Sequence, residues 1–338
     1  MISKSAVFGL LLLFSLSLYA QELVKRTQVL MGTYVSVSLP KDEMSRAESV
    51  FQRLRAVEMA LSSYDANAQV YKLNYNKEVM LSLDTYEALV LSQKYYKQSD
   101  GYFDITIGSI TKGLFHFGEQ EQLPNAYDLE HAKIDVKGLH FRQDKAWIDE
   151  GIVIDLGGMG KGFGVDKAVE VLAGVSQAVV ALSGDIYCIG HCKMEIQNPF
   201  EEEGILASFS MKDMAISTSG NYRRFVKSSE FNHLINPKKR ASQKNFASIT
   251  LISNRHSSSD LDAYATAASV MPYAKAIRFL KQRKVGYLLV RESKVVELNE
   301  RFNALTSELT LFAPLKKRER GYIRAVPLTF QNSKKLSL

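Results

Sequence analysis

The residues best suited to binding chemistry form a glycine-rich stretch from Asp155 to Ala168. It reads Asp-Leu-Gly-Gly-Met-Gly-Lys-Gly-Phe-Gly-Val-Asp-Lys-Ala, a strand-like run that leads through five glycines into a helix-like run. Glycine lets backbone N–H groups approach a ligand, and a helix N-terminus favours negative charge. Phosphate is the natural ligand of such a loop, and Lys161 would supply a counter-charge. The alternative is a tight turn that only packs a helix on a sheet.

The spacing of these glycines does not fit the two most familiar phosphate motifs. The Walker pattern would need glycine at position 155 and serine or threonine at 162, where this chain has Asp155 and Gly162. The dinucleotide pattern Gly-x-Gly-x-x-Gly fails in every register. Neither ordinary P-loop nor Rossmann chemistry is therefore supported.

A second candidate pair is Asp262 and Thr266, in a stretch that opens a helix behind three serines. Residues four apart lie on one face of a helix, so the carboxylate and the hydroxyl would point the same way. Such hard oxygen ligands suit Mg²⁺, which completes its octahedron with substrate phosphates and water. An aspartate in a first turn can instead simply complement the helix dipole, so the pair gains weight only beside a phosphate loop.

A third candidate is His233, eight residues after the stretch Ser217-Thr-Ser-Gly-Asn-Tyr-Arg-Arg-Phe225. An unperturbed histidine has a pKa of about 6.5, which suits general-base work near neutrality. The alternative is an ordinary surface histidine in a loop.

The elements that must position these residues are mixed strands and helices. Alternation predicts a strand over 31–39, a helical period predicts a helix over 47–61, and a second helix fits 84–99 with Asp84 as cap and Gly101 as stop. Further strand-like runs cover 146–156, 177–190, 206–217 and 247–254, and helix-like runs cover about 160–173 and 260–283. The pattern indicates an α/β or α+β body, and periodicity does not choose between them.

Composition indicates a folded protein. The chain has 338 residues, of which 46% are hydrophobic and 23% charged, so it can bury a large core and is neither a disulfide-stapled miniprotein nor a disordered tail. No repeat and no Pro/Gly/Ser linker divides it. We expect one compact unit over 21–313.

The two ends differ from this body. Lys4 precedes an uncharged run that stops near Ala20, which predicts an exported protein with a signal peptide over 1–20, or alternatively an uncleaved anchor. Residues 314–338 hold seven lysines or arginines and one glutamate, so the rest of the mature chain is formally neutral. A basic tail on a neutral body argues against nucleic acid and for a membrane surface or an acidic partner, unless it is merely a solvated terminus.

Cys188 and Cys192 are the only cysteines. Export would place them in an oxidising compartment, so we expect a disulfide across a hairpin. With His191 between them they could instead suggest zinc, but this short cluster supplies too few well-spaced ligands.

In order along the chain, these segments resemble the ApbE-type FAD:protein FMN transferases, which attach FMN through a phosphoester to threonine or serine of target proteins. The resemblance runs from about Leu30 to Arg301, and eight segments in family order make it specific. They are Met31-Gly-Thr33; Leu61-Ser-Ser-Tyr64 with Leu73-Asn74; Gly101-Tyr-Phe-Asp-Ile-Thr-Ile-Gly108; Asp155 to Asp166; Ser183-Gly-Asp185; Ser217-Thr-Ser-Gly220 with Tyr222-Arg223; His233 to Pro237; and Asp262-Ala-Tyr-Ala-Thr266.

The resemblance implies a fold and a flavin site. The fold would be one α+β body, T-fold-like, with mixed or antiparallel sheets flanked by helices and the active-site cleft between the sheets. The FAD site would be lined by Met31, Tyr64, Tyr102, Phe103 and Asp104.

The resemblance also implies the reacting groups. Asp155 and Lys161 would hold FAD around its diphosphate, and the backbone carbonyl of Gly158 would bind Mg²⁺ together with Asp262 and Thr266. The metal and Lys161 would neutralise the diphosphate while an acceptor hydroxyl attacks the FMN-side phosphorus and expels AMP. His233 is the candidate base for that hydroxyl.

Three segments depart from the family pattern. The family usually has Ser-Glu around Ala68-Gln69, Gly-Gly-Asp at Ser183-Gly-Asp185, and His-x-Ile-Asp-Pro-x-Thr-Gly where this chain has His233-Leu-Ile-Asn-Pro-Lys-Lys-Arg240. Asn236 supplies no carboxylate, and two cations replace a small turn.

We therefore predict an exported, periplasmic or inner-membrane-associated, Mg²⁺-dependent enzyme that transfers FMN from FAD to a flavoprotein. Two rival functions are kept beside this prediction. One rival is an FAD pyrophosphatase that releases FMN and AMP, and the other is a carrier that holds FAD without turnover.

Overall fold

The computed structural model describes residues 22–222, 224–312, 315–317 and 323–325. The predicted signal peptide lies outside the described residues. Of the predicted basic tail, 315–317 and 323–325 are described and form two short strands.

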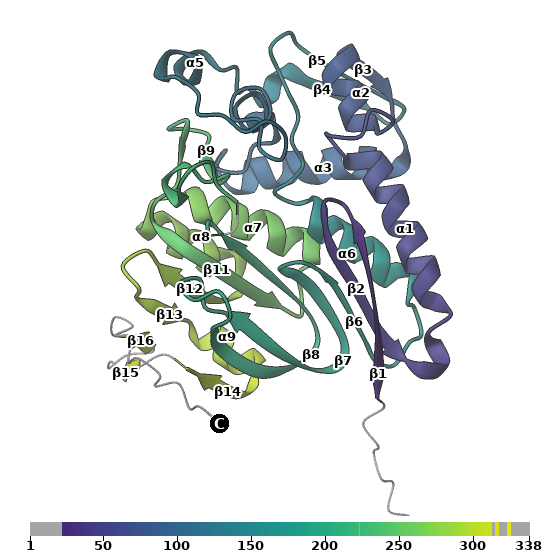
Figure 1. Cartoon of the computed structure of the whole chain (residues 1–338), viewed down its shortest axis with the longest axis vertical. Coiled ribbons are helices and arrows are strands. Elements are labelled where there is room, and N and C mark those ends of the chain that lie inside the picture. Colours follow the sequence, from purple (N-terminus) through teal and green to yellow (C-terminus); the bar gives the residue numbers. More distant parts are fainter. Residues whose placement is uncertain (1–21, 223, 313–314, 318–322, 326–338) are drawn as a thin grey trace, which may run out of the picture.

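One large antiparallel sheet organises the molecule (Figure 1). Its eleven strands include one, β14 (Ser307–Leu311), that pairs with β8 off the main path. In order across the sheet the others are β1 (Leu23–Leu30), β2 (Thr33–Pro40), β6 (Ala178–Leu182), β7 (Asp185–Gln197), β8 (Ile205–Gly220), β11 (Phe246–Ser253), β12 (Gly286–Arg291), β13 (Val296–Leu298), β16 (Ile323–Ala325) and β15 (Leu315–Lys317).

Helices and two small sheets complete the body. The helices are α1 (Arg46–Leu61), α2 (Gln69–Asn76), α3 (Leu83–Gln98), α4 (Gly108–Thr111), α5 (Ala126–His131), α6 (Gly160–Val171), α7 (Ser258–Val270), α8 (Tyr273–Arg283) and α9 (Glu300–Leu305). The small sheets are β3 (Glu78–Met80), β5 (Lys145–Ile148) and β4 (Leu139–Arg142), and the pair β9 (Ile235–Asn236) and β10 (Ala241–Ser242). This is the predicted α+β class, with an antiparallel sheet flanked by helices. Among the described residues no helix is both long and apolar enough to cross a bilayer.

Helices α6 and α7 lie side by side on the sheet, α6 against β6 and β7 and α7 against β8 and β11. Alanines make up much of α7, and small side chains allow close approach between a helix and its neighbours. All of its residues except Thr266 are buried. Helix α7 is therefore a core helix with one partly open position.

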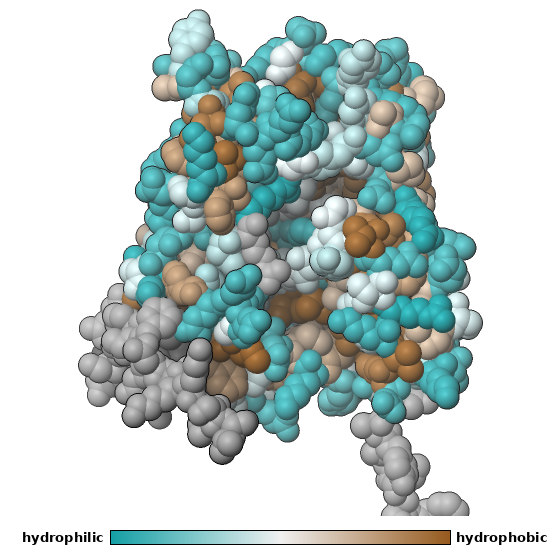
Figure 2. Space-filling view, viewed as in Figure 1, coloured by the Kyte–Doolittle hydropathy of each residue, from teal (hydrophilic) through white to brown (hydrophobic). Residues whose placement is uncertain are grey.

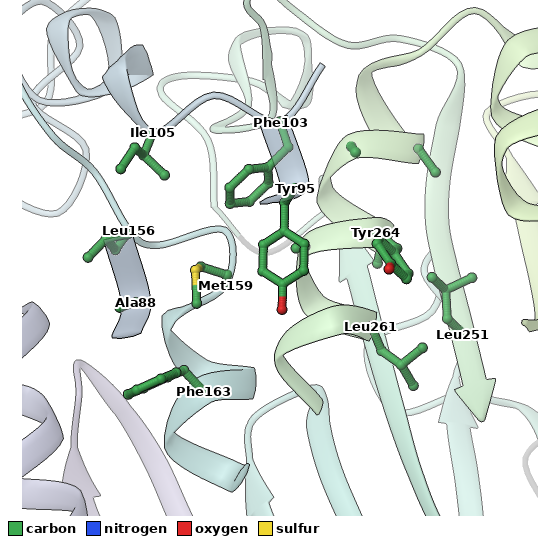
Figure 3. Close-up of a cluster of buried hydrophobic side chains, with 14 of the residues drawn as sticks. Ala88, Tyr95, Phe103, Ile105, Leu156, Met159, Phe163, Leu251, Leu261 and Tyr264 are labelled. Atoms are coloured by element: carbon green, nitrogen blue, oxygen red, sulfur yellow. The ribbon is translucent and has the colours of Figure 1, made fainter. Parts of the chain in front are cut away.

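Aromatic side chains fill the core beside these two helices (Figure 3). The ring of Tyr95 meets Phe103 edge to face at 5.6 Å and Tyr264 at 5.9 Å, with Met159 close to Phe163 in the same layer. Edge-to-face rings are favoured by their quadrupoles and restrict one another's orientation. The start of α6 and the body of α7 are thus held against one rigid cluster.

Several predicted boundaries are wrong. Residues 31–39 do not form one strand, because Met31 and Gly32, with φ of 52° and 68°, make the two-residue turn between β1 and β2. Helix α3 is capped by Ser82, whose hydroxyl accepts from the Thr85 N–H, and Asp84 instead pairs with Arg53.

Two longer predicted elements also differ from the structure: one is divided into two helices, and the other is shortened. The run 260–283 forms two helices, because α7 ends before Pro272 and α8 begins after it. The run 146–156 keeps strand geometry only to Ile148, where β5 ends.

The disulfide between Cys188 and Cys192 is present, which confirms the pairing. It does not cross a hairpin, however. Both cysteines lie on β7, whose register shifts between Cys188 and His191. Residues four apart in a regular strand share a face but lie about 13 Å apart. The irregularity in β7 brings their Cα atoms to 6.0 Å. Because the two thiols are bonded to each other, they supply no thiolate ligands for zinc.

Candidate functional site

The glycine-rich stretch ends at the junction of α6 and α7. The Gly162 N–H donates to Oδ2 of Asp262 at 3.0 Å. A Cβ at position 162 would lie 2.3 Å from the carbonyl oxygen of Ser258, so only glycine permits this approach. From the other side, Asp166 of α6 accepts N–H bonds from Ser258 and Ser259 at 2.7 and 2.9 Å. These contacts fix the first half of α6 to the first turns of α7.

Lys161 lies between two buried carboxylates at this junction. Its ammonium donates to Oδ2 of Asp185 and lies 3.6 Å from Oδ2 of Asp262. Asp185, fully buried at the start of β7, also accepts from the Ser217 hydroxyl of β8 at 2.5 Å. One lysine thus faces two carboxylates, one from the sheet and one from α7.

Burial and the neighbouring Asp185 raise the pKa of Asp262, and Lys161 offsets only part of this effect. Burial lowers the pKa of Lys161, but the two carboxylates outweigh it and hold the pKa above its usual value. Lys161 therefore remains charged. Asp185 and Asp262 supply two carboxylates against the one ammonium of Lys161, so their arrangement favours an added cation.

Gly158 and Thr266 face each other beside this group. A Cβ at position 158 would lie 3.3 Å from Oγ1 of Thr266 and 3.3 Å from the ring of Phe103. The Thr266 hydroxyl has no hydrogen-bond partner among the described residues, whereas Ser269 on the same helix donates to the Ala265 carbonyl at 2.7 Å. An available hydroxyl at the one open position of α7 is suited to a ligand.

These residues fit the predicted Mg²⁺ ligands. Among the described residues no group of three or more His, Cys, Asp or Glu side chains is arranged to hold a metal by itself. A hard cation with few protein ligands does not require one, because substrate oxygens and water complete its shell. The two carboxylates around Lys161 and the Thr266 hydroxyl, which has no partner in the described part of the chain, both fit such an ion.

Asp155, predicted to hold FAD, closes the loop before α6. Its Oδ2 accepts from the Thr111 hydroxyl at 2.6 Å and its Oδ1 from the Gly157 N–H at 2.8 Å. Burial raises the pKa of Asp155, but Lys112, Thr111 and Gly157 together lower it below its usual value. An ionised Asp155 therefore shapes the glycine loop from within.

Tyr64 lies at an exposed edge of this region, with 43% of its surface accessible. Its hydroxyl donates to the Phe117 carbonyl at 2.8 Å and accepts from the Arg224 guanidinium at 2.5 Å. The Lys112 ammonium lies 3.4 Å from the centre of its ring. In the same view as Figure 1, the surface is hollowed between the upper part, which carries α5 and β3 to β5, and the strands below (Figure 2).

His233 lies in the loop before β9, with its ring edge to face against Phe117 at 6.5 Å. Its Nδ1 is 3.1 Å from the Arg224 carbonyl oxygen, and a carbonyl only accepts, so Nδ1 carries the proton and Nε2 keeps its lone pair. Burial and the Arg224 charge lower the pKa of His233 to about 4. The side chain is therefore neutral at neutral pH, with Nε2 available to accept a proton.

The remaining predicted flavin contacts divide into two groups. Met31 packs on α6, where a Cβ at Gly164 would be 3.0 Å from its sulfur, and Phe103 borders Gly158. Asp104 is buried and accepts from the Thr106 N–H and hydroxyl at 2.9 and 2.7 Å, and burial raises its pKa despite those bonds.

Tyr102 has different neighbours. Lys238 and Lys275 lie 4.8 and 4.6 Å from the centre of its ring, and both pair with Asp100. The structure therefore surrounds Tyr102 with surface cations, while Phe103, next in sequence, faces Gly158.

Sequence reasoning gave no role to several residues of this region. Asp185 and Ser217 were identified only as parts of motifs, and nothing in their spacing indicated that they meet Lys161. Thr111 and Lys112 follow the Gly101–Gly108 segment and carry no pattern of their own. The Ser-Gly-Asp motif was the one available signal, since it places a carboxylate directly after a tight turn.

Comparison with known proteins supports this picture. The ApbE family model matches residues 31–289. A protein from Klebsiella pneumoniae named FAD:protein FMN transferase is 24% identical over 304 residues, which cover 82% of this chain and 94% of the relative. One of the same name from Treponema pallidum is 26% identical over 298 residues, which cover 76% and 81%.

The fold agrees with a solved member of the family. The crystal structure of the ApbE protein of Thermotoga maritima superposes with a TM-score of 0.77 at 22% identity, covering 85% of this chain and all of that one. It supports the predicted α+β fold. Because the family model spans most of the chain, the chain belongs to the ApbE family and is a transferase, as its motifs predict.

Proposed function

We propose that this chain transfers the FMN part of FAD to a threonine or serine hydroxyl of a target flavoprotein, with Mg²⁺ as cofactor and AMP as the second product. The arrangement at the α6–α7 junction carries the proposal. There Gly158 faces the unpartnered Thr266 hydroxyl, and Lys161 is shared by Asp185 and Asp262. The names of the relatives support the flavin substrate.

Asp262, Thr266 and the backbone carbonyl of Gly158 would hold Mg²⁺. When bound, the metal would neutralise charge on the diphosphate. Lys161 lies between Asp185 and Asp262, so its part in the site is to organise the two carboxylates.

His233 would accept the proton of the acceptor hydroxyl at Nε2. The hydroxyl oxygen forms a bond to the FMN-side phosphorus, and the bond from that phosphorus to the AMP oxygen breaks, so AMP leaves with the electron pair. A neutral histidine with Nδ1–H bound to the Arg224 carbonyl has the tautomer this step requires.

The cell location and partner belong to the same proposal. The signal-like segment over 1–20 would export the chain to the periplasm or the outer face of the inner membrane. The acceptor would then be a membrane-associated redox protein, and the basic residues of 314–338 would assist contact with the membrane surface.

The test follows both products in one reaction. Residues 21–338, FAD and Mg²⁺ are incubated with a periplasmic flavoprotein domain, and the labelled acceptor and AMP are quantified with and without chelator. One AMP for each labelled acceptor, lost with chelator, is expected. A matched acceptor with valine at the target threonine should release no AMP. AMP in excess of label would indicate a pyrophosphatase, and bound FAD with neither product would indicate a carrier.

A further inference from the structure

Two cations near the glycine loop form no ion pair within the part of the chain that the structure describes. Lys112 and Arg224 both contact Tyr64, one over its ring and one at its hydroxyl. Within the described part of the chain neither comes within ion-pair distance of a carboxylate. Both residues are partly buried.

Lys161, the other cation of the site, has a different electrostatic environment. The charge of Lys161 is matched by Asp185 and Asp262, so little of it remains for a substrate anion. Lys112 and Arg224 both lower the pKa of Asp155 from beyond ion-pair distance, so two cations share one carboxylate and one positive charge remains in excess. A partly buried cation whose charge is only partly offset is stabilised by a ligand that brings negative charge. Lys112 and Arg224 are therefore better placed than Lys161 to bind an anion.

Their neighbours tie them to the reacting groups. Lys112 directly follows Thr111, which binds Asp155 of the glycine loop, and the backbone carbonyl of Arg224 accepts from His233. Tyr64 joins the two cations, so an anion between them would lie close to both the loop and the base. This position suits a phosphate group better than a distant docking contact.

We propose that Lys112 and Arg224 form an anion subsite around Tyr64 that binds a phosphate group of the flavin nucleotide. The inference rests on the proposed function and deepens it, because it moves the counter-charge of the diphosphate from Lys161 to these two residues. Arg224 can donate two parallel hydrogen bonds to phosphate, and Lys112 acts as a point charge.

Binding titrations of residues 21–338 with FAD and with riboflavin, followed by flavin fluorescence, test the subsite. Riboflavin has the same ring system and no phosphate. Lys112→Gln and Arg224→Gln should each weaken FAD binding about tenfold, since a hydrogen bond to a charged group has about that value. Riboflavin binding should remain within twofold. The matched control is Lys193→Gln, an exposed lysine on β7 roughly 25 Å along the strand from Asp185.

Each possible result supports or overturns the proposed anion subsite. Equal weakening of FAD and riboflavin would mean that the cations only hold Tyr64 in place, which overturns the proposal. Unchanged FAD binding with a raised KM for the acceptor would assign them to an acidic group of the acceptor instead, which also overturns it. Selective loss of FAD binding in a chain that labels no acceptor would support the subsite and overturn the proposed function.

Discussion

The site contains cations in two different electrostatic environments: Lys161 is paired with carboxylates, whereas Lys112 and Arg224 form no ion pair among the described residues. Lys161 is matched by Asp185 and Asp262, and its surroundings are complete without a ligand. Lys112 and Arg224 contact the π-face and hydroxyl of Tyr64, act on Asp155 only over a longer distance, and form no ion pair among the described residues. The difference teaches that a lysine inside a loop that resembles a phosphate-binding loop need not bind phosphate. Its charge can instead pair with carboxylates, and in our proposal Lys112 and Arg224 face the substrate phosphate.

The largest expected effect comes from removing Asp262, one of the two carboxylates that neighbour Lys161. Asp262→Ala should reduce Mg²⁺-dependent transfer about a thousandfold or more, because a metal ligand contributes several kcal/mol to the barrier. The fold should persist, since little core volume is lost. Transfer rate and the circular dichroism melting curve measure the two effects. Full activity of the folded variant would refute the metal assignment.

Next in size is the loss of the base. His233→Ala should slow transfer roughly 10²–10⁴-fold. Because the pKa of His233 is lowered to about 4, the side chain is neutral above that value, so the rate of the unaltered chain should stay level from pH 8 to about 5.5 and fall toward pH 4. A pH–rate profile checks this. A loss below threefold on substitution, or a break near pH 6.5, would remove His233 from proton transfer.

A smaller effect, on the free energy of unfolding, tests whether Lys161 is paired with the two carboxylates. Lys161→Met leaves Asp185 and Asp262 facing each other, with an expected cost of about 2 kcal/mol, below the 3–5 typical of a fully buried pair because one-third of the lysine side chain is exposed.

The pH dependence of that cost has a definite sign. Without the ammonium, burial and the neighbouring Asp185 keep the folded-state pKa of Asp262 above its unfolded value of about 3.9, so the folded state binds more protons and stability rises as pH falls. Urea unfolding at pH 8 and pH 5 should show a smaller deficit at pH 5. An equal deficit at both would indicate lost packing rather than charge.

The smallest change separates ligand binding from folding on one helix. Thr266→Val should lower transfer about tenfold and leave the melting temperature unchanged, because its hydroxyl bonds to nothing in the described chain. Ser269→Ala is the matched control. It removes a hydrogen bond to Ala265 and should lower stability by about 1 kcal/mol without affecting transfer. A reversed pattern would place the ligand site elsewhere.

The sequence predicted local features better than contacts between residues that are distant along the chain. The four-residue spacing of Asp262 and Thr266 required only a helix, and α7 provides it. The bond from Lys161 to Asp185 could not be anticipated, because it depends on how α6 packs against β7, 24 residues away. Tyr102 and Phe103 show the same limit. A shared motif placed both at the flavin, whereas adjacent side chains diverge and only Phe103 borders Gly158.

Boundaries were missed for reasons of the same kind. Alternation does not reveal a two-residue turn with positive φ, so Met31 was assigned to a strand. The helical period continues through Met271 and Pro272, although the missing N–H of proline divides α7 from α8.

The most direct test of the account is the intact mass of an acceptor domain after incubation with FAD, Mg²⁺ and either the unaltered chain or Asp262→Ala. The account predicts a gain of one FMN phosphoester with the unaltered chain and no gain with the variant. An acceptor that gains the same mass with both chains, or with neither while FAD is bound, would contradict it.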